Sequence, residues 1–342
     1  MNNLDILKHK ASQLLEKRLA KQKQLSGAHS KSHLIITANL TQLVGKIYKF
    51  SDQELFLSYF AALFHDIVRS PAQDKDLKDE ELSSKQASKL LENFKVSDEE
   101  KEAVSYAIIN HGSNPKWMEN PITREDLPQS LKEKVRFALF VADKIEQNGV
   151  RVIARRSAFI AERFAPAGDL KSFGFVSGKD ELLAVAIESI IRLTFITPQY
   201  IYSNKLEPLL KPLYKIHLDF VSGILKALNL SVERLAEILL NTKRSDGKNF
   251  LDIRKIQVKD QHELINLIEK NGQITDQKIQ QVADQLKEAS REAINYFSSN
   301  YKTDLDQVIR KWNPESKIGK DWYGQMIEYL NGNWYKSIEN QI

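Results

Sequence analysis

The sequence contains no cysteine among its 342 residues. This absence excludes disulfide bonds, thiolate nucleophiles, and zinc or iron–sulfur centres held by cysteine. Any metal ion must therefore be bound by histidine, aspartate or glutamate side chains. Glycine and proline are also scarce, with 13 and 9 residues respectively. Long stretches of the chain thus lack the residues that interrupt helices.

Membrane and export signals are missing as well. No apolar run approaches the roughly 20 residues that a membrane-spanning helix needs, and the N-terminal MNNLDILKHK has no apolar signal core. The 50 basic and 45 acidic residues leave a net charge of +5. This mild excess suits an anionic ligand, whereas nucleic-acid binding usually shows a clustered basic face. We expect a cytoplasmic protein without membrane association; a nucleic-acid partner is disfavoured but not excluded.

Apolar residues recur at helical spacing along most of the chain. This spacing predicts a series of helices in the first half, at residues 4–15, 34–47, 53–64, 131–146 and 150–164. Ser83 is a plausible cap for a further helix, and Ser97 forms a capping box with Glu100 at the start of another. Strand-like alternation is weak throughout, so the predicted fold class is all-α.

The residues suited to metal chemistry gather in this first half. Four of the seven histidines lie between residues 29 and 111, and His65 is followed at once by Asp66 after an apolar helix. Burying an imidazole and a carboxylate together is costly unless something pairs with them, which a divalent cation does well. His33 precedes this pair by 32 residues, and Asp143 follows another apolar helix. The order is therefore H…HD…D.

This order resembles the HD-domain superfamily of metal-dependent phosphohydrolases, and it looks most similar to small bacterial HD proteins typified by nucleotide pyrophosphohydrolases. The stretches that carry the resemblance are 61–68 (AALFHDIV), 83–91 (SSKQASKLL), 107–111 (AIINH) and 142–156 (ADKIEQNGVRVIARR). The resemblance implies an HD-domain helical bundle with one divalent metal ion at its centre. The implied metal ligands are His33, His65, Asp66 and Asp143. We expect the HD domain within residues 1–225 and a C-terminal helical domain of unassigned role at 226–342.

Three further residues, which could contribute to the predicted metal site, have more than one interpretation. His29 lies four residues before His33 and could compete with it as a ligand. His111 lies where some family members place a histidine near a second metal or a substrate phosphate, and others a structural hydrogen-bond partner. Glu146 shares a helical face with Asp143. It could hold a ligand in place, orient a water molecule, or be solvated.

Basic residues follow the metal motif closely. Lys144 comes directly after Asp143, Arg151 and Arg155 follow on the next predicted helix, and Arg69 comes three residues after Asp66. Guanidinium groups suit phosphate because they donate in a planar fork. We therefore predict that Lys144, Arg151 and Arg155 bind substrate phosphate. An exposed basic helix face is the alternative for each of them.

The resemblance implies hydrolysis of a phosphate ester or anhydride by metal-activated water. The implied substrate is a small phosphorylated molecule, with a nucleotide as the best-supported class, and a homo-oligomer stays open. Ligation by two imidazoles and two carboxylates suits Mn²⁺ or iron better than Mg²⁺, although Mg²⁺, nickel and zinc are not excluded. The residues to which we assign catalytic roles are Asp66, His111, Arg69 and Glu146.

Some positions depart from the family pattern. The run His29-Ser30-Lys31-Ser32-His33 keeps two histidines but lacks the family's aspartate, and Ile36 and Ala72 replace expected basic residues. These departures motivate an alternative, in which a catalytically weak HD scaffold acts as a nucleotide-binding or regulatory module. A third, lower-ranked hypothesis is an HD-type di-iron oxygenase. It needs further ligands, for which the chain offers His29, His111 and Glu146.

Overall fold

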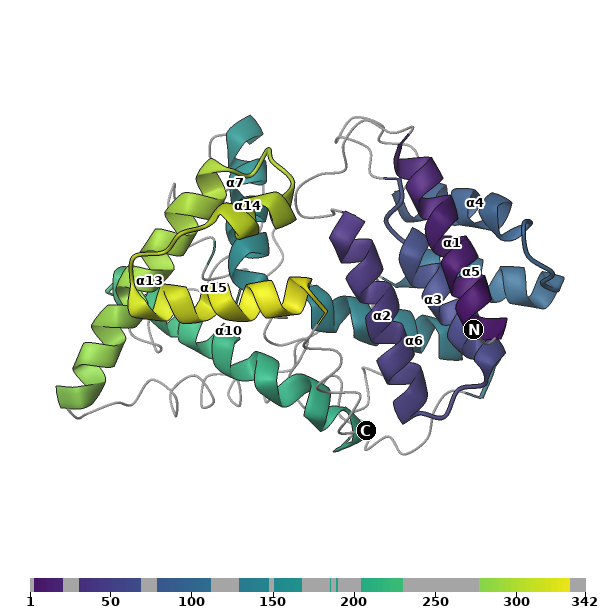
Figure 1. Ribbon diagram of the computed structural model, residues 1–342, viewed down its shortest axis with the longest axis horizontal. Helices are drawn as coiled ribbons and strands as arrows, with labels where there is room; N and C mark the ends of the chain where they lie inside the picture. Colours follow the sequence, from purple (N-terminus) through teal and green to yellow (C-terminus); the bar gives the residue numbers. More distant parts are fainter. Residues whose placement is uncertain are drawn as a thin grey trace, which may run out of the picture. The chain divides into compact units, whose positions relative to one another are not determined.

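The computed structural model describes residues 3–20, 31–68, 79–111, 129–147, 151–167, 204–229 and 277–332, together with the single residues 185 and 189. Within these ranges the chain forms 11 α-helices and one short 3-10 helix, and no strand (Figure 1). The all-α prediction is therefore confirmed. None of the helices in these ranges is both long enough and apolar enough to traverse a bilayer.

The chain divides into two compact units. The first unit runs to Glu146 and takes in the 3-10 helix η4 (Asn204–Leu206), which contacts α2. The second unit begins at Gln147 and continues through most of α10 (Glu207–Ala227) to the C-terminal helices. The predicted domain boundary after residue 225 falls inside α10, so the compact units do not follow it. The reason is that α7, which comes directly after the first unit, packs against helices from the C-terminal third.

The first unit is built around one buried helix. Its helices are α1 (Asn3–Leu19), α2 (Lys31–Ile47), α3 (Asp52–Phe64), α4 (Asp79–Leu91), α5 (Asp98–Asn110) and α6 (Leu131–Gln147). All residues of α3 from Leu55 to Phe64 are buried. A helix that is apolar on every side must be surrounded by other elements, and α3 indeed contacts α1, α2, α4 and α5.

Local signals fix where these helices begin. Ser51 and Glu54 form a capping box at the start of α3, and Ser97 and Glu100 form the predicted one at the start of α5. Along α3, the rings of Phe60 and Phe64 lie 4.7 Å apart and form part of the core. This packing places the end of α3, and the His-Asp pair that follows it, inside the first unit.

The helix predicted to begin at Ser83 begins one turn earlier. Its first turn carries Asp79, Glu80 and Glu81, which favour a helix N-terminus through the macrodipole. Ser83 is buried inside α4, where its hydroxyl accepts a hydrogen bond from the Val68 amide (3.1 Å) and donates one to the Val68 carbonyl (3.3 Å). The serine thus fixes the backbone two residues after Asp66 and does not cap the helix.

The second unit has a core of its own. It contains α7 (Val152–Ala167), most of α10, α13 (Gln277–Ser299), α14 (Leu305–Lys311) and α15 (Lys317–Leu330). The ring of Trp312 lies 5.0 Å from that of Phe297, and the ring of Trp322 lies 6.0 Å from that of Phe220. Helices α10 and α13 approach closely at Gly223, where a Cβ atom would lie 2.4 Å from the Leu286 carbonyl oxygen.

Candidate metal centre

The four predicted ligands come from three helices of the first unit. His33 lies in the first turn of α2, His65 caps the C-terminus of α3 and Asp66 follows it, and Asp143 lies in the last turns of α6. All four side chains are buried. The apolar helices therefore carry these polar groups into the interior at the points where the helices start or end.

The ligand atoms of these four residues converge. The Nε2 atoms of His33 and His65 lie 3.1 Å apart. The Nε2 atom of His33 lies 3.6 Å from Asp143 Oδ1 and 3.7 Å from Asp66 Oδ2. The Nε2 atom of His65 lies 3.7 Å from Asp143 Oδ1 and 3.6 Å from Asp66 Oδ2. The distances to the carboxylates are too long for good hydrogen bonds. They are close to the roughly 3.0 to 3.4 Å that separates neighbouring ligand atoms when each bond to a shared ion is about 2.1 Å.

The hydrogen bonds of the rings determine which nitrogen can bind a metal. His65 Nδ1 donates to the Ala62 carbonyl at 2.8 Å, because a carbonyl oxygen can only accept. His33 Nδ1 lies 2.7 Å from Oε2 of Glu146. In the neutral rings both Nε2 atoms therefore carry lone pairs, and these face each other. Such an arrangement is repulsive unless a cation or a proton lies between them, so the site fits a metal ion.

The charges also suit metal binding. Burial opposes ionisation of Asp143, but Lys144, His65 and His33 outweigh it and hold its pKa well below the ordinary value. Burial likewise opposes protonation of His65, and the carboxylates of Asp66 and Asp143 outweigh that and raise its pKa. The lowered pKa of Asp143 favours the carboxylate form, which a metal ligand must have.

Lys144 contacts a predicted ligand. Its Nζ donates to Oδ2 of Asp143 at 3.1 Å, while Oδ1 of Asp143 faces the two imidazoles. Lys144 is itself buried. The predicted role of Lys144 in phosphate binding stays a prediction, and the contact gives it a second role, which is to fix which oxygen of Asp143 points toward the metal.

His111 lies on the other side of Asp66. It caps the C-terminus of α5, its Nδ1 donates to the Ile108 carbonyl at 2.6 Å, and its Nε2 lies 4.0 Å from Asp66 Oδ1. Burial, reinforced by nearby His65, lowers the pKa of His111. His65, Asp66 and His111 form a second group whose ligand atoms lie close enough to share an ion. Asp66 therefore faces both groups, one with each oxygen.

Glu146 is fully buried beside His33. Of its three interpretations, the solvated one is excluded by this burial. Glu146 is engaged with a predicted ligand, which fits the interpretation that it holds the ligand in place. The sequence placed it on the same helical face as Asp143, but gave no sign that its partner would be on α2.

The remaining predicted residues belong to the second unit or lie outside the described ranges. Arg151 and Arg155 are buried in the second unit, where Arg151 Nη1 donates to Oδ1 of Asp306 at 2.8 Å. Arg69 and His29 fall outside the described residues. Their predicted roles stay predictions.

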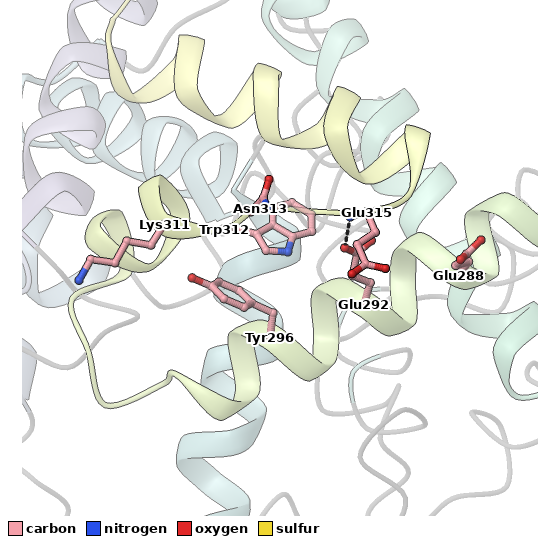
Figure 2. A pocket seen from close by; sticks show the side chains of 7 residues that line it. All are labelled: Glu288, Glu292, Tyr296, Lys311, Trp312, Asn313 and Glu315. Atoms are coloured by element: carbon pink, nitrogen blue, oxygen red, sulfur yellow. Dashed lines mark hydrogen bonds between the residues drawn. The ribbon is translucent and has the colours of Figure 1, made fainter.

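A separate pocket of about 350 Å³ lies in the second unit (Figure 2). Its lining residues are Glu288, Glu292, Tyr296, Lys311, Trp312, Asn313 and Glu315. Glu292 accepts hydrogen bonds from the Glu315 amide (2.5 Å) and the Ser316 hydroxyl (2.8 Å), so its carboxylate holds the segment before α15 in place. No histidine lines the pocket, and it offers no ligand set like that of the first unit.

Comparison with known proteins agrees with this geometry. The family model for the HD domain matches residues 31–148. This segment is an HD domain. The match begins at α2 and ends just after α6, so the HD domain contains all four predicted ligands together with His111 and Glu146. HD domains are mostly metal-dependent hydrolases and typically bind a divalent metal.

No curated protein and no solved structure matches the chain. The family assignment therefore concerns the HD domain, and no relative names a substrate for the chain. The prediction of a likeness to nucleotide pyrophosphohydrolases stays a prediction.

Proposed function

We propose that the HD domain hydrolyses a phosphate ester or anhydride of a small phosphorylated molecule, with a nucleotide as the favoured class. The observation that supports this proposal is the convergence of two imidazole Nε2 atoms and two carboxylates in a buried site. Buried carboxylates and imidazoles without a compensating ion would be costly. A site that concentrates such groups is suited to a metal and a polar reaction.

His33, His65, Asp66 and Asp143 would hold the ion. When bound, a divalent ion lowers the pKa of a bound water and polarises a phosphoryl oxygen. The mixture of two nitrogen and two oxygen donors favours Mn²⁺ or Fe²⁺, because Mg²⁺ prefers oxygen ligands alone.

Asp66 and His111 would orient the attacking water. The Oδ1 atom of Asp66 and the Nε2 atom of His111 lie 4.0 Å apart, so one water molecule can reach both. Because His111 Nδ1 donates to the Ile108 carbonyl, its Nε2 accepts hydrogen bonds in the neutral ring. This makes His111 better suited to hold or take a proton from water than to neutralise the charge of a phosphoryl group.

The negative charge of the substrate would be met by basic side chains. Arg69, Lys144, Arg151 and Arg155 are our proposed phosphate ligands, on the strength of their positions in the sequence. Lys144 and Arg151 also contact carboxylates within their own units, Asp143 and Asp306. Any contribution they make to phosphate binding would be in addition to these contacts.

The proposal is tested by elemental analysis of the purified full-length protein and by a nucleotide screen with and without Mn²⁺. We expect Asp66→Ala to lose bound metal and hydrolysis together while the far-ultraviolet circular dichroism is unchanged. Asp98→Ala is the control, because Asp98 is a fully exposed carboxylate on the first turn of α5. Wild-type turnover in the Asp66→Ala variant would show that the assigned centre is wrong.

The same screen addresses the alternative of a regulatory module. The replaced basic positions Ile36 and Ala72 favour that alternative, since they remove groups that family members use near the substrate. A metal-loaded protein that binds a nucleotide but hydrolyses none of the panel would support the regulatory module over the hydrolase.

A further inference from the structure

One hydrogen bond in the metal centre differs in kind from the others. His65 and His111 each direct Nδ1 to a backbone carbonyl three residues back on the same helix. His33 directs Nδ1 to the carboxylate of Glu146, which is 113 residues away along the chain and lies on α6. In each of the three rings a hydrogen bond at Nδ1 fixes the orientation, and at His33 the partner is a carboxylate.

A carboxylate acceptor does more than a carbonyl. Either group fixes the position of the ring proton and leaves Nε2 free to bind metal. A carboxylate also adds negative charge to the imidazole, which strengthens Nε2 as a donor, and bonds to ionised acceptors are stronger than neutral ones. Both side chains have no solvent exposure. The interaction is therefore little screened by water.

The full burial of Glu146 bears on the charge of its carboxylate. An ionised carboxylate in the interior is costly unless positive charge lies nearby. A divalent ion bound at Nε2 of His33 would supply that charge through the ring. The carboxylate would then stabilise the imidazole, and the imidazole would be a stronger donor to the ion.

Because Glu146 lies on α6, one helix contributes two parts of the metal centre. Asp143 lies about one helical turn before Glu146, so α6 would supply both a metal ligand and the partner of a second ligand. Thr37, one turn after His33 on α2, places its hydroxyl 3.4 Å from the same Nδ1. At that distance the hydroxyl is at best a weak acceptor, which leaves Glu146 as the close one.

We propose that Glu146 is a positioning residue that acts through His33, and that it sets the affinity of the centre for its metal ion. It neither touches substrate nor orients the attacking water. This inference rests on the metal site of the proposed function, and it does not depend on hydrolysis.

The test compares Glu146→Gln with Glu146→Ala in the full-length protein. Glutamine keeps the size and can still accept from Nδ1, but it carries no charge; alanine removes the acceptor. The measurement is the Kd for Mn²⁺ and Co²⁺, obtained by competition with a metal-sensitive dye. We expect Kd to rise about 10-fold for the glutamine variant and about 100-fold for the alanine variant.

A second measurement separates positioning from mere structural support. The visible absorption of bound Co²⁺ depends on the donor strength of its ligands, so Glu146→Gln should shift the bands. The matched control is Glu133→Gln, which neutralises another carboxylate of α6, one that pairs with Tyr106 and Arg136. The control should leave both Kd and the Co²⁺ spectrum unchanged.

The outcomes are distinguishable. Wild-type Kd and spectrum in Glu146→Gln would overturn the positioning role, whatever happens to the melting temperature. If the alanine variant does not fold, the glutamine variant alone decides. Failure of the wild-type protein to bind either metal would remove the proposed centre and this role with it. Tight metal binding without hydrolysis of any nucleotide would refute the proposed function but leave the role of Glu146 standing.

Discussion

The buried ammonium group of Lys144 lies 3.1 Å from Oδ2 of Asp143. The sequence predicts that Lys144 binds substrate phosphate, and the contact suggests that it also orients a metal ligand. The two roles predict different effects on metal binding and substrate binding when the positive charge of Lys144 is removed. Without Lys144, Asp143 would lose both the donor that fixes Oδ2 and a positive charge that keeps its pKa low.

We therefore predict the effect of Lys144→Met, which removes the charge and keeps much of the side-chain volume. If Lys144 orients Asp143, the Kd for Mn²⁺ should rise about 10-fold while the KM for the substrate is unchanged. Metal competition assays and steady-state kinetics measure the two quantities. A raised KM with a wild-type metal Kd would instead assign Lys144 to phosphate binding.

The residue scale also shows what could be predicted from the sequence. His33, His65, Asp66 and Asp143 were found because their types and order carry the chemistry, and the structure brings them together. Their partners could not be found in the same way. Backbone carbonyls carry no side-chain signal, and the pairing of Glu146 with His33 depends on how α6 packs near α2.

At the scale of the helices, hydrophobic periodicity predicted that a helix exists better than it predicted the residues at which the helix begins and ends. The prediction for residues 131–146 agrees with α6, and the capping box at Ser97 is confirmed. The prediction that Ser83 caps a helix was wrong, because the local sequence does not distinguish a serine that caps a helix from one that lies inside it. Its actual partner, the backbone of Val68, comes from tertiary structure.

Helix packing in the second unit gives a prediction with an internal control. Ala at Gly223 would place its Cβ 2.4 Å from the Leu286 carbonyl oxygen, where rigid helix backbone cannot yield easily. We expect Gly223→Ala to lower the free energy of unfolding by about 1–3 kcal/mol. Gly324 of α15 serves as the control, because a Cβ added there would meet no atom within 4 Å.

In the control variant Gly324→Ala, the change in the free energy of unfolding should have the opposite sign. Alanine has the higher helix propensity, so Gly324→Ala should raise the free energy of unfolding by up to about 1 kcal/mol. Urea denaturation followed by circular dichroism measures both variants. Equal effects of the two substitutions would contradict the close approach of α10 and α13.

At the scale of the whole molecule, the division into units was the least predictable feature. From the sequence, the boundary between the HD domain and the C-terminal domain is predicted after residue 225. The compact units instead divide after Glu146, since α7 contacts α13 and α14, which come more than a hundred residues later. Contacts between distant segments leave no periodic pattern in the sequence, and the HD-domain match ends at residue 148.

The second unit contains a buried histidine that should make its stability depend on pH. His217 of α10 has no solvent exposure, and burial together with the positive charge of Arg156 lowers its pKa to about 3. Its pKa in the unfolded chain is about 6.5. Between these values the unfolded state binds more protons than the folded state, so stability is complete above about pH 6.5 and falls as the pH drops toward about 3.

We expect the second unit to lose about 3 kcal/mol of stability between pH 7 and pH 4 from this group. Urea denaturation at pH 7, 5 and 4 measures the loss through the fluorescence of Trp312 and Trp322, which are buried in this unit. In His217→Met the titrating group is replaced by a flexible apolar side chain that can fill the same space. The pH dependence of that variant should be flatter by the same amount. An identical pH dependence in His217→Met and the wild-type protein would show that other groups control the acid stability of the unit.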